Sequence, residues 1–100
     1  MGKTVSGIYL VTEHCADLLE RVEIALQCGV GIVQYREKDP LAKDRLVTAC
    51  RLRELCRNYR ALFIVNDDPL LALIAKADGV HIGRVTCRWR LYGRISERAC

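Results

Sequence analysis

Four short apolar runs, separated by segments of helical periodicity, constrain the fold of this chain more than any other feature. The runs lie at residues 8–12, 31–35, 61–65 and 77–83. They are apolar almost throughout instead of alternating with polar residues, which indicates strands that are covered on both faces. Strands of this kind are typical of parallel sheets, because crossover helices cover both sides of such a sheet.

The segments between the runs carry apolar residues at helical spacing. We expect helices over residues 16–28 and 43–58, and a short third helix that starts at Asp68 and ends near residue 76. Gly29 follows the first of these segments, at a position where helix ends favour glycine. The resulting order, βαβαβαβ, predicts an α/β fold with a parallel sheet and right-handed crossovers.

Polar side chains gather where the predicted strands end. They are Thr12, Gln34, Arg36, Lys38, Asn66, Asp67 and His81. In barrels and open α/β sheets, ligands bind at the edge formed by the carboxyl ends of the strands. We therefore expect the functional site at this edge. His81 is interpreted as a packed strand-end residue and not as an acid or base.

Two groups of these residues predict an anion site with a metal ion. Gln34, Arg36 and Lys38 are spaced by two, so an extended backbone would present all three on one face, which suits pyrophosphate. Asn66 and Asp67 directly follow a buried run, and a carboxylate there can hold Mg²⁺ beside substrate phosphates. Each group alone also fits an ordinary strand end or helix cap, but together they form a coherent pyrophosphate–Mg²⁺ site.

Length and composition limit the chain to one small domain. One hundred residues, 51% of them apolar, can bury a modest core. There is no export signal and no apolar run of about 18 residues, so we expect a soluble, cytoplasmic protein without membrane contact. The six cysteines form no C-x-x-C pair and no metal-ligand spacing with a histidine, which favours reduced thiols.

The net charge of +4 is confined to the C-terminal segment. Residues 1–83 contain 11 basic and 11 acidic residues, whereas residues 84–100 contain five arginines and one glutamate. The neutral body argues against nucleic-acid binding. Trp89 and the arginines of the tail could stack on RNA, but an accidental sequence is the favoured interpretation.

Several motifs together resemble the thiamine phosphate synthase family. They are Q-x-R-E-K-D at residues 34–39, N-D at residues 66–67 and A-D-G-V-H-x-G at residues 77–83. Their order and spacing match the family, and the resemblance covers residues 7–83. Each motif alone is weak, whereas the combination is specific.

The resemblance implies a (β/α)₈ TIM barrel and a transferase that joins hydroxymethylpyrimidine diphosphate to a thiazole phosphate and releases pyrophosphate. It implies Asp67 as the Mg²⁺ ligand and four residues that bind the pyrimidine substrate: Gln34, Arg36, Lys38 and Asn66. Arg36, Lys38 and the metal ion would neutralise the charge that develops on the leaving diphosphate. Catalysis would then be electrostatic, without a protein nucleophile.

The chain departs from the family after Gly83. The family continues with G-Q-x-D, whose Asp is a second metal ligand, and Arg84-Val85-Thr86 stands there instead. A complete barrel needs at least about 200 residues. We therefore expect residues 1–83 to form a truncated half barrel of about four parallel strands, inactive alone. Its first and fourth strands would be unpaired edges that favour self-association.

Residues 84–100 are interpreted as an unrelated, arginine-rich tail. Because the resemblance and the neutral composition end together, we hypothesise a shift of reading frame; back-translation allows a frame with an Asp opposite Val85 or Thr86. Two alternatives stay open: a thiazole tautomerase-type member of the same family, and a non-catalytic fragment or interaction module. Gln34 with Asn66 and Asp67 favours the synthase.

Overall fold

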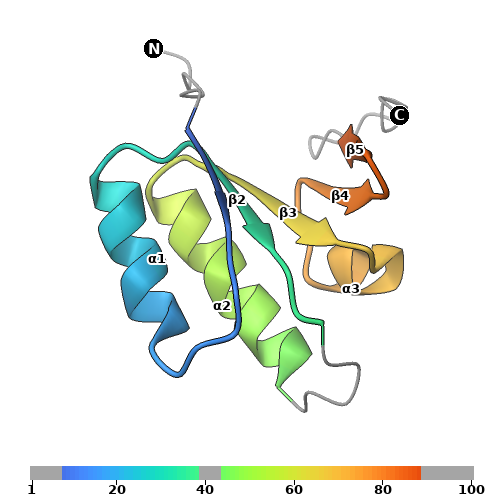
Figure 1. Ribbon diagram of the computed structural model, residues 1–100, viewed down its shortest axis with the longest axis horizontal. Helices are drawn as coiled ribbons and strands as arrows, with labels where there is room; N and C mark the ends of the chain where they lie inside the picture. Colours follow the sequence, from blue (N-terminus) through green and yellow to red (C-terminus); the bar gives the residue numbers. More distant parts are fainter. Residues whose placement is uncertain (1–7, 39–43, 89–100) are drawn as a thin grey trace.

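The computed structural model describes residues 8–38 and 44–88 as a five-stranded sheet with three helices (Figure 1). The strands are β1 (Tyr9–Val11), β2 (Ile32–Tyr35), β3 (Leu62–Asn66), β4 (Gly79–Ile82) and β5 (Val85–Arg88). The helices are α1 (Leu18–Gln27), α2 (Arg45–Asn58) and α3 (Pro69–Ile74). The predicted elements agree with these bounds to within two residues, although residue 43, the predicted start of the second helix, lies outside the described ranges.

The sheet has the order β1-β2-β3-β4-β5, and its first four strands run parallel. The register aligns Val11 with Gln34, Gln34 with Ile64, and Asn66 with His81. Crossover helices connect the parallel strands, so the predicted α/β fold of the half barrel is confirmed.

Local chemistry explains where the helices begin and end. Gly29, just beyond α1, has φ +106°, a conformation that side chains with a Cβ rarely adopt, as predicted for a helix end. At the start of α3, the Asp68 carboxylate accepts a hydrogen bond from the Leu71 N–H at 3.0 Å, and Pro69 occupies the first turn. Asp68 is therefore the N-cap of α3, at the position where the sequence predicts this helix to start.

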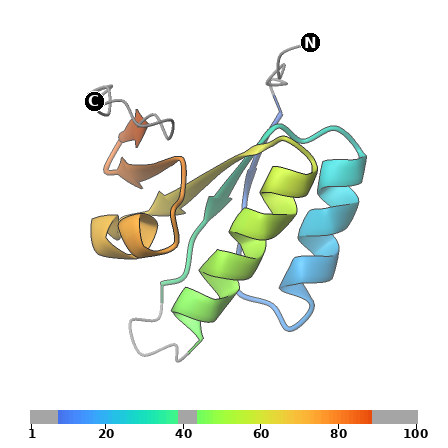
Figure 2. The ribbon, with the colours of Figure 1, turned by 180° about the vertical axis from the view of Figure 1, so that it is seen from behind.

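The core lies between the sheet and the helices. Helices α1 and α2 lie side by side along the strands, and α3 contacts β3 and β4 (Figure 2). The buried strand residues of this layer include Val33, Tyr35, Phe63, Val65 and Val80. The predicted apolar stripe of α2 faces them, because Ala49, Leu52 and Cys56 are each at most 1% exposed. None of the described helices has the length and apolarity needed to span a bilayer.

The opposite face of the sheet carries no described helix. Tyr9 and Val11 of β1 are each 43% exposed there. By contrast Gln34 and Ile64, which follow Val11 in the sheet register, are 5% and 1% exposed. In a closed barrel this face lines the interior.

Strand β5 is the main departure from the sequence-based expectation. It pairs antiparallel with β4 after a turn that begins at Gly83, whose φ is +61°. Cys87 on this strand packs against the core. The prediction that the fourth strand is an unpaired edge is therefore wrong, whereas the outer edge of β1 pairs with no other described strand.

Candidate functional site

The polar residues singled out in the sequence lie at the carboxyl ends of the parallel strands. Thr12 follows β1, and Arg36 and Lys38 follow β2. Asn66 is the last residue of β3, and Asp67 follows it. The parallel arrangement brings these strand ends to one edge of the sheet, as expected.

Strand β2 ends at Tyr35, so the regular strand pairing stops before Arg36 and Lys38. The prediction that Gln34 shares one strand face with Arg36 and Lys38 stays a prediction. Gln34 is 5% exposed and lies on the sheet face that carries no described helix, whereas Arg36 is half-buried and Lys38 is exposed.

Thr12 determines where the chain goes after β2. Its N–H donates to the Gln34 carbonyl oxygen at 2.9 Å, and its Oγ1 accepts a hydrogen bond from the Arg36 N–H at 3.1 Å. Thr12 is only 3% exposed, so these bonds are shielded from water. The hydroxyl thus anchors the backbone of Arg36 after the regular strand pairing has ended.

Arg36 and Lys38 line a cavity of about 270 Å³ between the segments that follow β1 and β2. Its other walls are Thr12, Glu13, His14 and Glu37. The cavity therefore carries a guanidinium, an ammonium and an imidazole, opposed by two carboxylates.

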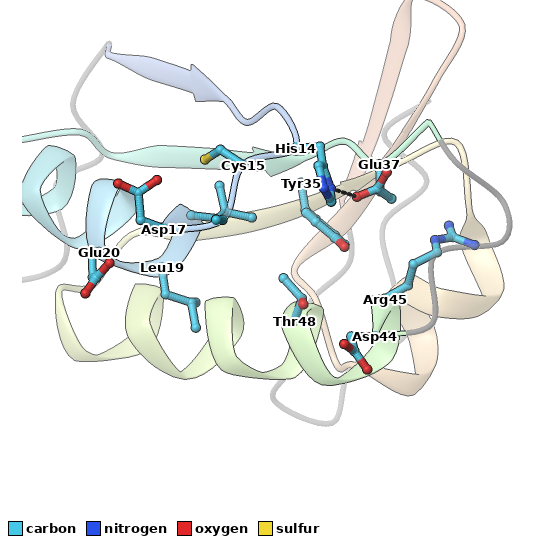
Figure 3. Close-up of a pocket in the computed structure, with 12 residues that line it drawn as sticks. His14, Cys15, Asp17, Leu19, Glu20, Tyr35, Glu37, Asp44, Arg45 and Thr48 are labelled. Atoms are coloured by element: carbon cyan, nitrogen blue, oxygen red, sulfur yellow. Dashed lines mark hydrogen bonds and ion pairs between the residues drawn. The ribbon is translucent and has the colours of Figure 1, made fainter.

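The imidazole and one of these carboxylates bind each other. His14 Nδ1 lies 3.1 Å from Glu37 Oε1, and the Glu37 side chain is 8% exposed (Figure 3). Both residues also line a second cavity of about 540 Å³ near the starts of α1 and α2. Tyr35 forms part of that cavity, and its pKa is raised by burial and by the nearby Glu37 carboxylate. The His14–Glu37 pair is thus shared between the two cavities.

A chain of hydrogen bonds crosses the three strands β1, β2 and β3. Gln34 Nε2 donates to the Tyr9 hydroxyl at 2.7 Å, and Asn66 Nδ2 donates to Gln34 Oε1 at 2.9 Å. Both ends of the buried Gln34 amide therefore have protein partners. The Gln34–Asn66 bond connects the end of β2, which precedes Arg36 and Lys38, with the end of β3, which precedes Asp67.

Asp67 places a carboxylate directly after β3, at the carboxyl edge of the sheet. It is exposed, has φ +58°, and donates its N–H to the His81 carbonyl oxygen at 2.7 Å. Among the described residues no group of three His, Cys, Asp or Glu could hold an ion.

The imidazole of His81 has a partner on β5. Its Nδ1 lies 2.7 Å from Thr86 Oγ1, and the residue is half-buried. Asp68, next to the candidate metal ligand, accepts a hydrogen bond from Arg45 Nη2 at 2.6 Å in addition to capping α3.

Sequence reasoning did not single out Tyr9, His14 or Glu37 as site residues. Glu37 lies within the Q-x-R-E-K-D motif, and this was the one signal that could have drawn attention to it. The contacts of Tyr9 with Gln34 and of His14 with Glu37 join residues 25 and 23 positions apart, and no local pattern specifies them.

Comparison with known proteins gives consistent matches. The sequence model of the family described as thiamine monophosphate synthase matches residues 8–96. The chain is similar to the thiamine-phosphate synthase of Synechocystis sp., with 54% identity over 78 residues that cover 78% of this chain and 23% of the relative. It is 50% identical to the thiamine-phosphate synthase of Halorhodospira halophila over 80 residues, which cover 80% and 38% of the two chains.

The fold resembles a solved structure as well. Thiamine phosphate pyrophosphorylase from Pyrococcus furiosus superimposes with a TM-score of 0.67 at 33% identity, over 73% of this chain and 37% of that chain. This chain therefore spans less than two-fifths of the length of these relatives. The family match extends beyond Gly83 to residue 96, and the predicted domain boundary at Gly83 stays a prediction.

Proposed function

The chain belongs to the thiamine monophosphate synthase family, and from this premise we propose that it is a portion of a thiamine phosphate synthase. The transferase of this lineage would join hydroxymethylpyrimidine diphosphate to a thiazole phosphate and release pyrophosphate. The described residues would supply the part of the site that binds the pyrimidine diphosphate and Mg²⁺. A cytoplasmic location and the inactivity of the chain alone belong to the same proposal.

One observation carries this assignment. The Asn66–Gln34 hydrogen bond of 2.9 Å joins the carboxyl ends of β3 and β2. The segment after β2 supplies Arg36 and Lys38, and the segment after β3 supplies Asp67. Two cationic side chains and a carboxylate at neighbouring strand ends suit a diphosphate whose oxygens also bind a divalent metal ion.

The proposed mechanism is electrostatic. The bond between the pyrimidine's methylene carbon and the diphosphate oxygen breaks, and negative charge develops on the leaving pyrophosphate. Arg36 and Lys38 stabilise this charge, and Mg²⁺, when bound at Asp67, would supply further neutralisation. The thiazole nitrogen then forms a bond to the carbon, so no protein nucleophile is needed.

Calorimetric titration with inorganic pyrophosphate, with and without Mg²⁺, tests the proposal. We expect weak, Mg²⁺-dependent binding to the 100-residue chain. Arg36→Ala should weaken it roughly tenfold or more, because a charge-assisted, bidentate contact is lost. Asp67→Asn should remove the dependence on Mg²⁺.

Arg51→Ala provides the matched control, because Arg51 is an exposed arginine on α2, outside the residues that line the cavity. It should bind pyrophosphate as the wild type does. Equal affinity of the wild type and Arg36→Ala would remove Arg36 from the site.

A further inference from the structure

Tyr9 has a side chain that the proposed mechanism does not use, yet its hydroxyl ends the chain of hydrogen bonds at the candidate site. The ring lies on the open face of the sheet and is 43% exposed. Its oxygen accepts a hydrogen bond from Gln34 Nε2 at 2.7 Å. A tyrosine needed only for packing could lose its hydroxyl without consequence for the site.

Gln34 transmits the effect of this hydroxyl to Asn66. The Gln34 side chain is buried, and an amide that loses a partner there leaves a polar group unsatisfied. The Tyr9 hydroxyl holds the nitrogen end of this amide, so its oxygen end faces β3 and receives Asn66 Nδ2 at 2.9 Å. Asn66 is thereby held with its nitrogen toward β2 and its Oδ1 turned away from it.

The cationic residues are held by a separate set of bonds. The backbone of Arg36 is anchored by Thr12 Oγ1 at 3.1 Å, and Lys38 lies further along the same segment. The Thr12–Arg36 hydrogen bond does not involve the Tyr9 hydroxyl. The two hydrogen-bond systems can therefore be disturbed independently.

We propose that Tyr9 is a positioning residue for the pyrimidine diphosphate substrate, acting through Gln34 on Asn66. This inference rests on the proposed function. The Asn66 Oδ1 is an acceptor, as phosphate oxygens are, so it takes a hydrogen-bond donor on the organic part of the substrate. Arg36 and Lys38 take the diphosphate.

Tyr9→Phe in the 100-residue chain tests this division. Calorimetry is performed in the presence of Mg²⁺ with two probes, hydroxymethylpyrimidine diphosphate and inorganic pyrophosphate. The variant should bind the pyrimidine diphosphate roughly tenfold more weakly, because the part-buried hydrogen bond to Gln34 is lost. Its affinity for pyrophosphate should equal that of the wild type, which also shows that the variant is folded.

Tyr59→Phe is the matched control. The Tyr59 hydroxyl donates to Glu23 Oε2 at 2.9 Å and accepts from Gln27 Nε2 at 3.2 Å. These bonds join α1 to the end of α2, at the amino end of β3 and away from the candidate site. This variant should bind both probes as the wild type does.

The outcomes separate the inference from the proposed function. If the wild type binds neither probe, the proposed function fails and the inference fails with it. If the wild type binds both probes and Tyr9→Phe binds them equally well, only the role of Tyr9 is overturned. A variant that loses affinity for both probes to the same extent also overturns it, because the effect would then not pass through Asn66.

Discussion

Cys56 illustrates how burial controls side-chain chemistry at the scale of single residues. It lies on the core-facing side of α2 and is 1% exposed. Burial, assisted by the negative charge of Asp78, raises the pKa of its thiol to about 12. By contrast, Cys28 at the C-terminal end of α1 is exposed to solvent and is not part of the core. Cys56 therefore acts as a small apolar residue in the core-facing stripe of α2.

This pKa predicts a loss of stability at alkaline pH. The thiol has a pKa of 9.0 when exposed to water and of about 12 in the folded chain, so the unfolded state releases its proton first. The stabilisation is complete below pH 9 and is lost as the pH rises toward 12, by roughly 4 kcal/mol in the free energy of unfolding. Urea denaturation across this pH range measures the loss.

Cys56→Val is the control for that experiment, because valine fills a similar space and does not titrate. Tyr35, whose pKa is also raised, contributes equally to both proteins. The free energy of unfolding of the variant should therefore decline less steeply with pH. Parallel declines would exclude Cys56 as the source.

At the scale of elements, Asp68 ties α3 to α2. One carboxylate oxygen caps α3 through the Leu71 N–H, and the other accepts a hydrogen bond from Arg45 Nη2 at 2.6 Å. Both side chains of the ion pair are about one-quarter exposed, so water screens it only in part. The short helix α3 thus depends on a residue just outside it.

Asp68→Ala should lower the free energy of unfolding by about 1–2 kcal/mol, because the cap is lost. Asp68→Asn should retain most of the capping effect, since asparagine is an equally good N-cap, and should lose only the ion pair. Urea denaturation of the two variants and the wild type gives the comparison. If the alanine variant is as stable as the wild type, Asp68 does not stabilise α3.

At the scale of the whole molecule, the open sheet face and the outer edge of β1 are the features to explain. Tyr9 and Val11 expose apolar surface on this face, and β1 has no second neighbour among the described strands. An unpaired strand edge beside apolar surface favours pairing with another chain. Strand β5 covers the outer edge of β4 and is itself the other outer strand of the described sheet. Because the exposed apolar side chains of Tyr9 and Val11 belong to β1, association should involve the β1 side of the sheet.

We therefore expect the chain to self-associate in sedimentation velocity experiments. Val11→Lys, which places a charge on the open face, should shift the population toward the monomer. Ile24→Lys is the control, because Ile24 is 59% exposed on α1 and not on the sheet. A wild-type chain that sediments as a single monomeric species would contradict the prediction.

The sequence by itself determined the order and the approximate bounds of the parallel strands and their helices. The signals for these elements are local, because they are read from residues a few positions apart. They are the spacing of apolar residues, the glycine at the end of α1 and the Asp-Pro pair at the start of α3. Because parallel strands end at one edge, the same pattern also located Arg36, Lys38 and Asp67 there. The placement of these three residues at one edge follows from the strand order and direction alone, and no knowledge of side-chain contacts is needed for it.

Only the tertiary structure decided how the site residues are held. The partners in the Tyr9–Gln34, Gln34–Asn66 and His14–Glu37 contacts are 25, 32 and 23 positions apart. The end of β2 at Tyr35 and the pairing of β5 with β4 likewise depend on neighbouring segments. Such contacts form because packing brings particular atoms within hydrogen-bond distance, and a one-dimensional pattern of polarity contains no information about those distances.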